Sequence, residues 1–107
     1  MQSDFFNIAE LKKRRTATGK PYLEFLRVPA MSAGIYALPT DGKDSQTPHK
    51  EDELYYVVRG QARMRVASEE HVVTEGSIVF VAAGVQHFFH QIKEELIVLV
   101  FFAPAES

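Results

Sequence analysis

Short runs of β-forming residues alternate with turn signals along most of the chain, and this spacing constrains the fold more than any other feature. The turn signals contain glycine, proline or adjacent charges, as in Gly19-Lys20-Pro21 and Pro39-Thr40-Asp41-Gly42. Many short strands at such intervals are typical of a sandwich or barrel. We therefore predict an all-β, antiparallel fold with strands over 21–28, 32–38, 53–59, 61–67, 71–74, 77–81, 86–91 and 96–102.

The first twenty residues do not follow this pattern. Only the stretch from Phe5 to Arg15 is a candidate for a helix of any length. We predict an N-terminal segment over 1–20, partly helical or extended, and one β-barrel domain over 21–107. A chain of 107 residues has the size of a single domain, and such a domain buries roughly two thirds of the surface of its unfolded form.

Two of the predicted strands differ in how they distribute polarity. In 61–67, Ala62 and Met64 share one face with Val66, and polar residues take the other. The run 96–102, LIVLVFF, is apolar on both faces. An antiparallel strand of that kind must cover its second face with another sheet or another chain, so we predict a homodimer.

The amino-acid composition limits the kinds of binding partner and of metal site that are expected. The chain has no cysteine, so any metal site must use nitrogen and oxygen ligands, and a reducing, cytoplasmic location is expected. Its 12 basic and 14 acidic residues give no electrostatic footprint for nucleic acid. The N-terminus lacks the apolar core of a signal peptide, and no apolar run approaches the ~20 residues of a membrane helix. We expect a small-molecule ligand or substrate, with no nucleic acid and no membrane partner.

One histidine and one carboxylate lie close together in the middle of the chain. Residues two apart on a strand point the same way, so Thr47 and His49 share a face, as do Glu53 and Tyr55 on the next strand. A short turn through 50–52, with Glu51 and Asp52 facing water, would bring Glu53 close to His49. A carboxylate beside an apolar run is costly to bury without a cation.

A second histidine follows a glycine turn farther along. His87 shares a face with Phe89 and Gln91 on the predicted strand 86–91. If the barrel closes with these strands as neighbours, His87 meets His49 and Glu53 inside it. Two imidazoles and one carboxylate suit a first-row divalent metal with open coordination positions.

These spacings resemble the two motifs of the cupin superfamily of small β-barrels. Its first motif runs His-x-His, three or four residues, Glu, six residues, Gly; His49, Glu53 and Gly60 reproduce its second half. Its second motif is matched by Gly76, Ala82-Ala83-Gly84, His87 and Gln91, with alanine in place of proline and glutamine in place of asparagine. The resemblance implies an RmlC-like, phosphomannose-isomerase-like jelly-roll barrel that binds a divalent transition metal such as iron, manganese, nickel or zinc.

The chain departs from the family pattern at one ligand. Thr47 stands where the first histidine is expected, and a hydroxyl is a poor ligand compared with imidazole. The missing bond then comes from water, from substrate, or from a side chain such as Gln46 or Gln91. With a four-residue loop, Gln46 and Pro48 would take the histidine places instead; the three-residue alternative keeps His49 in register and is preferred.

The residues thus receive the following expected roles. His49, Glu53 and His87 are the predicted metal ligands. His71 and His90 are expected to be non-ligands. The predicted pocket-lining residues are Thr47, Tyr55, Phe89 and Gln91.

Three functions are compatible with this sequence. The first is a non-haem metal-dependent oxygenase that acts on a small polar substrate, with no catalytic residue assigned. The second is a non-catalytic cupin that binds or senses a small ligand. The third, ranked last, is a sugar isomerase or epimerase, in which His49 or His87 would act as the base and Tyr55 as the acid.

Overall fold

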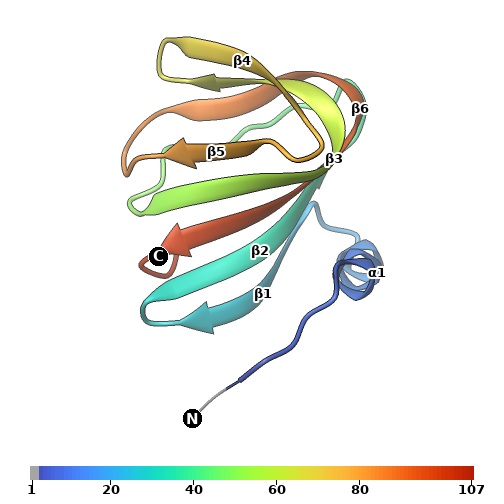
Figure 1. The fold of residues 1–107 in the computed structure, drawn as a ribbon, viewed down its shortest axis with the longest axis vertical. Helices are drawn as coiled ribbons and strands as arrows, with labels where there is room; N and C mark the ends of the chain where they lie inside the picture. Colours follow the sequence, from blue (N-terminus) through green and yellow to red (C-terminus); the bar gives the residue numbers. More distant parts are fainter. Residues whose placement is uncertain (1–2) are drawn as a thin grey trace.

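A computed structural model describes residues 3–107, so residues 1 and 2 of the predicted N-terminal segment lie outside the described residues. All paired strands run antiparallel, which confirms the predicted all-β fold. No helix in this part of the chain is long and apolar enough to span a bilayer. The elements are α1 (Ile8–Thr18), β1 (Tyr22–Val28), β2 (Met31–Leu38), β3 (Asp52–Val66), β4 (Glu69–Thr74), β5 (Ile78–Val81) and β6 (His87–Ala103) (Figure 1).

The helix lies slightly later than the predicted stretch 5–15. It starts at Ile8 because the side chain of Asn7 caps it, accepting hydrogen bonds from the backbone N–H groups of Ala9 and Glu10. It ends where Gly19 takes a left-handed conformation, with φ of 70°. Its one fully buried side chain, Leu11, packs against a small cluster on the outer side of β2 and β6.

Two pairs of predicted strands are each one long strand in the structure. The runs 53–59 and 61–67 form β3, and the runs 86–91 and 96–102 form β6. The first half of β3 pairs with β5 and with the end of β6, whereas its second half pairs with β4 and with the beginning of β6. The turn signals at Gly60 and at 92–95 are therefore bends within strands rather than strand ends.

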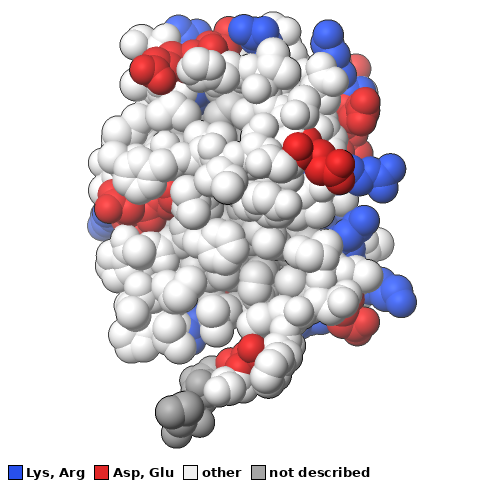
Figure 2. Space-filling view, in the orientation of Figure 1, with Lys and Arg blue, Asp and Glu red and all other residues white. Residues whose placement is uncertain are grey.

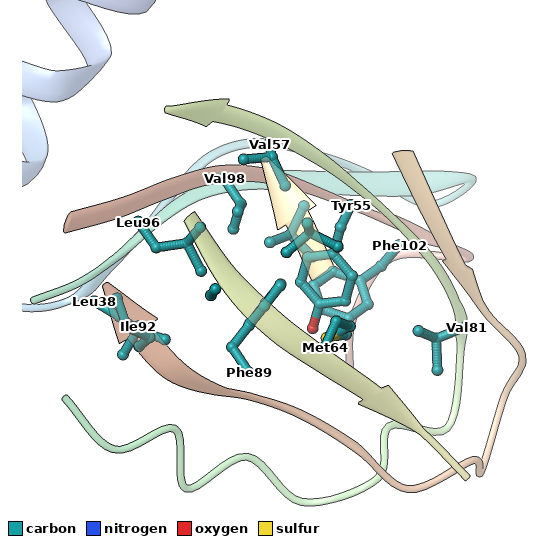
Figure 3. Close-up of a cluster of buried hydrophobic side chains, with 13 residues drawn as sticks. Leu38, Tyr55, Val57, Met64, Val81, Phe89, Ile92, Leu96, Val98 and Phe102 are labelled. Atoms are coloured by element: carbon teal, nitrogen blue, oxygen red, sulfur yellow. The ribbon is translucent and has the colours of Figure 1, made fainter. Parts of the chain in front are cut away.

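The bend in the β3–β6 ribbon closes the barrel. Pairing shifts register several times between Val57 and Arg63, at the point where Gly60 takes a φ of 105°. Side chains from both strands meet in the interior, as Figure 3 shows for Tyr55, Phe89 and Val98. The same bend brings the beginning of β6 back toward the beginning of β3, although these two ends are far apart along the ladder.

The run LIVLVFF distributes its residues between two environments. Leu96, Val98, Val100 and Phe102 belong to the interior core. Its other face is covered by α1 only in part, because Ile97 joins the cluster beneath the helix while Phe101 lies beyond it.

Candidate metal centre

The three predicted ligands come together at one end of the barrel. Glu53 lies at the start of β3 and is 2% exposed, and His87 lies at the start of β6 and is 1% exposed. His87 Nε2 is 2.6 Å from Glu53 Oε1, and His49 Nε2 is 3.9 Å from Glu53 Oε2. One ligand atom from each of the three residues lies within 4.8 Å of the other two. The group has the size and donor chemistry of a divalent metal site.

The carboxylate of Glu53 is buried without hydrogen bonds. Within residues 3–107, neither of its oxygens accepts a hydrogen bond from a group that is a donor in every protonation state, and its closest polar contact is His87 Nε2 at 2.6 Å, an ion pair only when that imidazole is protonated. Removing a carboxylate from water at such a site costs several kcal/mol unless a cation offsets it. The residues present therefore fit a bound metal ion.

The tautomer of His87 also indicates that a cation fits beside Glu53. Its Nδ1 lies 2.9 Å from the carbonyl oxygen of Val85, which can only accept, so Nδ1 carries a proton. In the neutral ring the Nε2 lone pair then faces Glu53. Burial lowers the pKa of His87, but Glu53 and the Val85 carbonyl outweigh it and raise that pKa overall. The position between Nε2 and the carboxylate thus attracts positive charge, which a proton or a metal ion can supply.

A chain of polar contacts leads from the site into the loop 39–51. The hydroxyl of Tyr55 lies 3.1 Å from His87 Nε2 and donates to Gln46 Oε1 at 2.9 Å. The same Gln46 oxygen is 3.2 Å from His49 Nε2. Burial raises the pKa of Tyr55, so this hydroxyl stays protonated and acts as a donor. Gln46, which is one expected substitute for the missing histidine, therefore contacts the predicted ligand His49 directly and is linked to His87 through Tyr55.

Asp44 fixes the loop that carries Gln46 and His49. Its carboxylate accepts hydrogen bonds from the Tyr36 hydroxyl, the Gln46 amide and the backbone N–H of Phe89, at 2.8 to 2.9 Å. Because Phe89 lies on β6, Asp44 connects a segment without strands to the barrel wall. The loop is thereby held over the site.

Removing that anchor should weaken both the fold and the site. We expect Asp44→Ala to lower the free energy of unfolding by about 2–3 kcal/mol, because three donors lose a charged acceptor. Denaturant unfolding of the metal-free protein measures this change. Ser45→Ala is the matched control, since Ser45 is the exposed neighbour of Asp44 and should change stability by less than about 0.5 kcal/mol.

Two residues expected to line the pocket lie elsewhere. Thr47 is exposed, and the backbone of the loop turns Gln46 toward His49 instead. Gln91 is also exposed: its φ of 47° breaks the strand alternation, and Ile92 takes the inward place. The expectation that Gln91 shares a face with His87 is therefore wrong. Phe89 is 1% exposed and packs edge-to-face on Tyr55 as part of the core.

The other polar residues of interest are accounted for by local contacts. Glu51 was expected to face water, which is wrong: it is 6% exposed and accepts a hydrogen bond from the backbone N–H of Ser107. Asp52 is exposed and accepts from the backbone of Ala83. His71 is exposed beside Glu69, and His90 pairs with Glu70 on the other half of the barrel.

A small cavity opens next to His49. Its volume is about 170 Å³, and within the described part of the chain the buried hydroxyl of Tyr22 beside it has no hydrogen-bond partner. Glu106 reaches this cavity from the last residues of the chain. Neither Tyr22 nor Glu106 could be predicted from the sequence, because neither residue lies in a motif. The lining residues are Tyr22, Tyr36, Gln46, His49, Val100, Phe102 and Glu106.

Comparisons with known proteins find a matching family model and a close relative in sequence. Residues 34–102 match the family model described as "Cupin domain". An uncharacterized protein of Streptomyces coelicolor is 50% identical over 102 residues, which cover 95% of this chain and 97% of that one.

Solved structures show the same fold at low sequence identity. An RmlC-like cupin from Shewanella frigidimarina superposes with a TM-score of 0.72 at 21% identity, covering 78% of this chain and 75% of the other. The protein TT1209 from Thermus thermophilus superposes with a TM-score of 0.70 at 24% identity, covering 78% and 82%. At these identities the likeness concerns the fold alone.

Proposed function

The chain belongs to the cupin domain family, and from that premise we propose that it is a metal-dependent oxygenase acting on a small polar molecule. The observation that carries the proposal is the buried carboxylate of Glu53, which lies between two histidines and has no hydrogen-bond donor among residues 3–107. Two imidazoles and one carboxylate form the ligand set of many non-haem metal oxygenases.

Four side chains would hold the ion. His49, Glu53 and His87 would supply two nitrogens and a carboxylate, and the amide oxygen of Gln46, 3.2 Å from His49 Nε2, would take the place of the missing histidine. When bound, a divalent ion such as iron, manganese, nickel or zinc supplies a Lewis acid with positions open to substrate oxygen atoms and to dioxygen. Tyr55 keeps Gln46 oriented by donating a hydrogen bond to it.

The cavity beside His49 limits the substrate. Its volume of about 170 Å³ corresponds to roughly five or six water molecules, well below the ~300 Å³ at which pockets for drug-sized ligands begin. The unpartnered Tyr22 hydroxyl offers a hydrogen bond to an oxygen or nitrogen of the ligand. Apolar contact comes from Val100 and Phe102. A compact molecule with one or two polar groups fits this arrangement.

The proposal is tested by metal titration followed by an oxygen assay. Protein stripped by a chelator is titrated with Fe²⁺, Mn²⁺, Ni²⁺ and Zn²⁺ under anaerobic conditions, and we expect one equivalent to bind. The iron-loaded protein is then screened for oxygen uptake with small diols, thiols and keto acids. Failure to bind any of the four ions contradicts the metal site, and absence of oxygen uptake across the panel contradicts the oxygenase.

A non-catalytic binding cupin is the second candidate. The observation in its favour is the buried Tyr22 hydroxyl beside the small cavity, which has no hydrogen-bond partner within residues 3–107 and can therefore bind a polar group of a ligand. Retention of a small molecule by the metal-loaded protein, without turnover, identifies this alternative.

We further propose that the protein acts as a homodimer through an outer apolar face, defined here as Leu54, Tyr56, Ile78, Phe80 and Phe101. These residues form neighbouring rows, because Leu54 pairs with Phe80 and Phe101, and Tyr56 pairs with Ile78. Phe80 and Ile78 are 60% and 66% exposed. The face is largely uncharged, with charged side chains toward its margins (Figure 2).

A second copy of the chain is a suitable partner for this face, because it presents the same uncharged, apolar surface. A two-fold axis would place the same patch on both sides of the interface. A shallow apolar groove of about 430 Å³, lined by Leu54, Phe80 and Phe101 among others, offers room for the exposed phenyl ring of the other copy. Contiguous exposed apolar surface of this kind marks an interaction site.

Phe80→Glu should therefore produce a monomer. We expect the mass measured by light scattering to fall from dimer to monomer, because the charge cannot be buried at a symmetric apolar interface. Val72→Glu is the control, since Val72 is 53% exposed on β4, away from the outer face. A wild-type protein that is already monomeric at micromolar concentration would contradict the dimer.

A further inference from the structure

The hydroxyl of Tyr22 is placed at the small cavity by two residues of β2. A β-carbon at Gly34 would lie 2.1 Å from this hydroxyl, so the phenol ring fits over β2 only because residue 34 has no side chain. Tyr36 packs edge-on against the same ring, with the ring centroids 6.2 Å apart. The hydroxyl oxygen is buried and has no hydrogen-bond partner within residues 3–107. A buried polar atom of this kind costs free energy unless a ligand or water satisfies it.

The carboxylate of Glu106 brings a negative charge to the same cavity. The backbone of this residue is fixed, since its N–H donates to the Ser32 hydroxyl at 2.9 Å and its carbonyl accepts from the Arg27 guanidinium at 2.7 Å. The carboxylate itself lines the cavity and is 27% exposed. In the part of the chain that the structure describes, no lysine or arginine forms an ion pair with it. His49 Nδ1 lies 3.1 Å away and carries no positive charge while its ring is neutral.

Negative charges outnumber positive charges around the Tyr22 hydroxyl. The guanidinium of Arg27 is already paired, because it donates to both carboxylate oxygens of Glu24, at 2.7 and 3.1 Å. Burial raises the pKa of Tyr22, and three carboxylates raise it further against the single opposing charge of Arg27: those of Glu106, Glu24 and Glu53. A metal ion held by Glu53 would balance that carboxylate but not Glu106. The cavity therefore favours a ligand that brings a positive charge.

We propose that this cavity binds a small primary alkylamine in its ammonium form. The ammonium group would donate hydrogen bonds to the Tyr22 oxygen and to the Glu106 carboxylate, and so satisfy both. The alkyl chain would lie against Val100 and Phe102, which are each 3% exposed. The cavity volume of about 170 Å³ limits this chain to a few carbon atoms. That the amine is a substrate rests on the proposed function, whereas its binding requires no metal.

Three probes of similar size separate the effect of charge from that of shape: butylamine, 1-butanol and butyrate. Binding to the full chain is followed by NMR titration at about pH 8, where alkylammonium and carboxylate groups are both charged. The backbone amide of Gly34, which lies beside the Tyr22 hydroxyl, is the reporter. In the metal-free protein we expect butylamine to bind about 10-fold more tightly than 1-butanol, and butyrate to bind more weakly than both. Butylamine should still bind after one equivalent of Zn²⁺ is added.

Conservative variants locate the ammonium group. Glu106→Gln should weaken butylamine binding about 10-fold and change 1-butanol binding by less than about 3-fold, because only the amine uses the charge. Tyr22→Phe removes one hydrogen-bond partner and should weaken butylamine binding about 5-fold. Glu69→Gln is the matched control for net charge, since the Glu69 side chain is 80% exposed on β4, and it should leave butylamine binding within about 2-fold of wild type.

Several results would overturn the amine cavity. Butyrate binding as tight as that of butylamine in the metal-free protein overturns it, as does butylamine binding that is unchanged in Glu106→Gln. Loss of butylamine binding in Glu53→Gln or on addition of Zn²⁺, with binding retained in Glu106→Gln, would place the ammonium group at the metal centre and also overturns it. If no metal ion binds while the three probes keep the expected order, the proposed function fails and the amine cavity stands.

Discussion

Replacing His87 with alanine is expected to lower the affinity for a divalent transition metal by on the order of 100-fold or more, because the change removes one of three strong ligands. Competition with a chromophoric chelator measures the affinity. His71→Ala is the matched control, since the His71 side chain is 76% exposed and lies outside the ligand group. Binding by His87→Ala that equals wild type would remove the metal site from the proposal.

Glu53→Gln separates loss of the site from loss of the fold. The amide keeps the shape of the side chain and removes a charge that has no hydrogen-bond donor in residues 3–107. Above the raised pKa of His87 the imidazole is neutral and the buried Glu53 charge is uncompensated, so at such a pH we expect the metal-free variant to be at least as stable as wild type while metal affinity falls as in His87→Ala. A purely structural role for the Glu53–His87 pair predicts the opposite, a clear loss of stability.

Gly60→Ala should destabilise the fold strongly, and far more than Gly76→Ala. A β-carbon at this position would lie 2.3 Å from the Glu95 carbonyl oxygen and 2.8 Å from the Leu96 α-carbon, both in the backbone of β6. The φ of 105° adds strain for any side chain. We expect the free energy of unfolding to fall by about 3 kcal/mol or more, measured by denaturant titration.

Gly76→Ala is the control that separates the steric clash with β6 at Gly60 from the strain of a positive φ. Gly76 has a φ of 92°, but a β-carbon there meets no atom within 4 Å. Its substitution should therefore cost only the conformational strain, about 1–2 kcal/mol. Equal effects at both positions would show that the contact between β3 and β6 at the bend does not limit the fold.

The sequence predicted those parts of the site that depend on strand periodicity. Glu53 and Tyr55 alternate regularly with exposed residues on β3, so their inward placement could be derived from spacing. His87 follows a short glycine turn, which fixes where β6 begins. The remaining ligand, His49, was predicted from the resemblance of the spacing between His49, Glu53 and Gly60 to the first cupin motif.

The rest of the site depends on contacts that spacing does not encode. Gln46 rather than Thr47 reaches His49 because the Asp44 hydrogen bonds shape a segment without a regular period. Gln91 does not point into the barrel as predicted, because its own backbone takes a left-handed conformation that interrupts the strand alternation. Glu106 reaches the cavity only after β6 has paired with β2 and carried the following segment to Ser32. Contacts of this kind join residues that are far apart in the sequence, so residue spacing does not predict them.

The side chains that would bind the metal belong to two parts of the fold, and these parts differ in how readily they open locally. Glu53 and His87 belong to paired strands, which separate only when much of the barrel does. Gln46 and His49 belong to the loop 39–51, whose local opening needs far fewer broken contacts. The residence time of a bound ion is therefore expected to follow the opening rate of this loop, so Asp44→Ala should accelerate exchange even under conditions where the barrel stays folded.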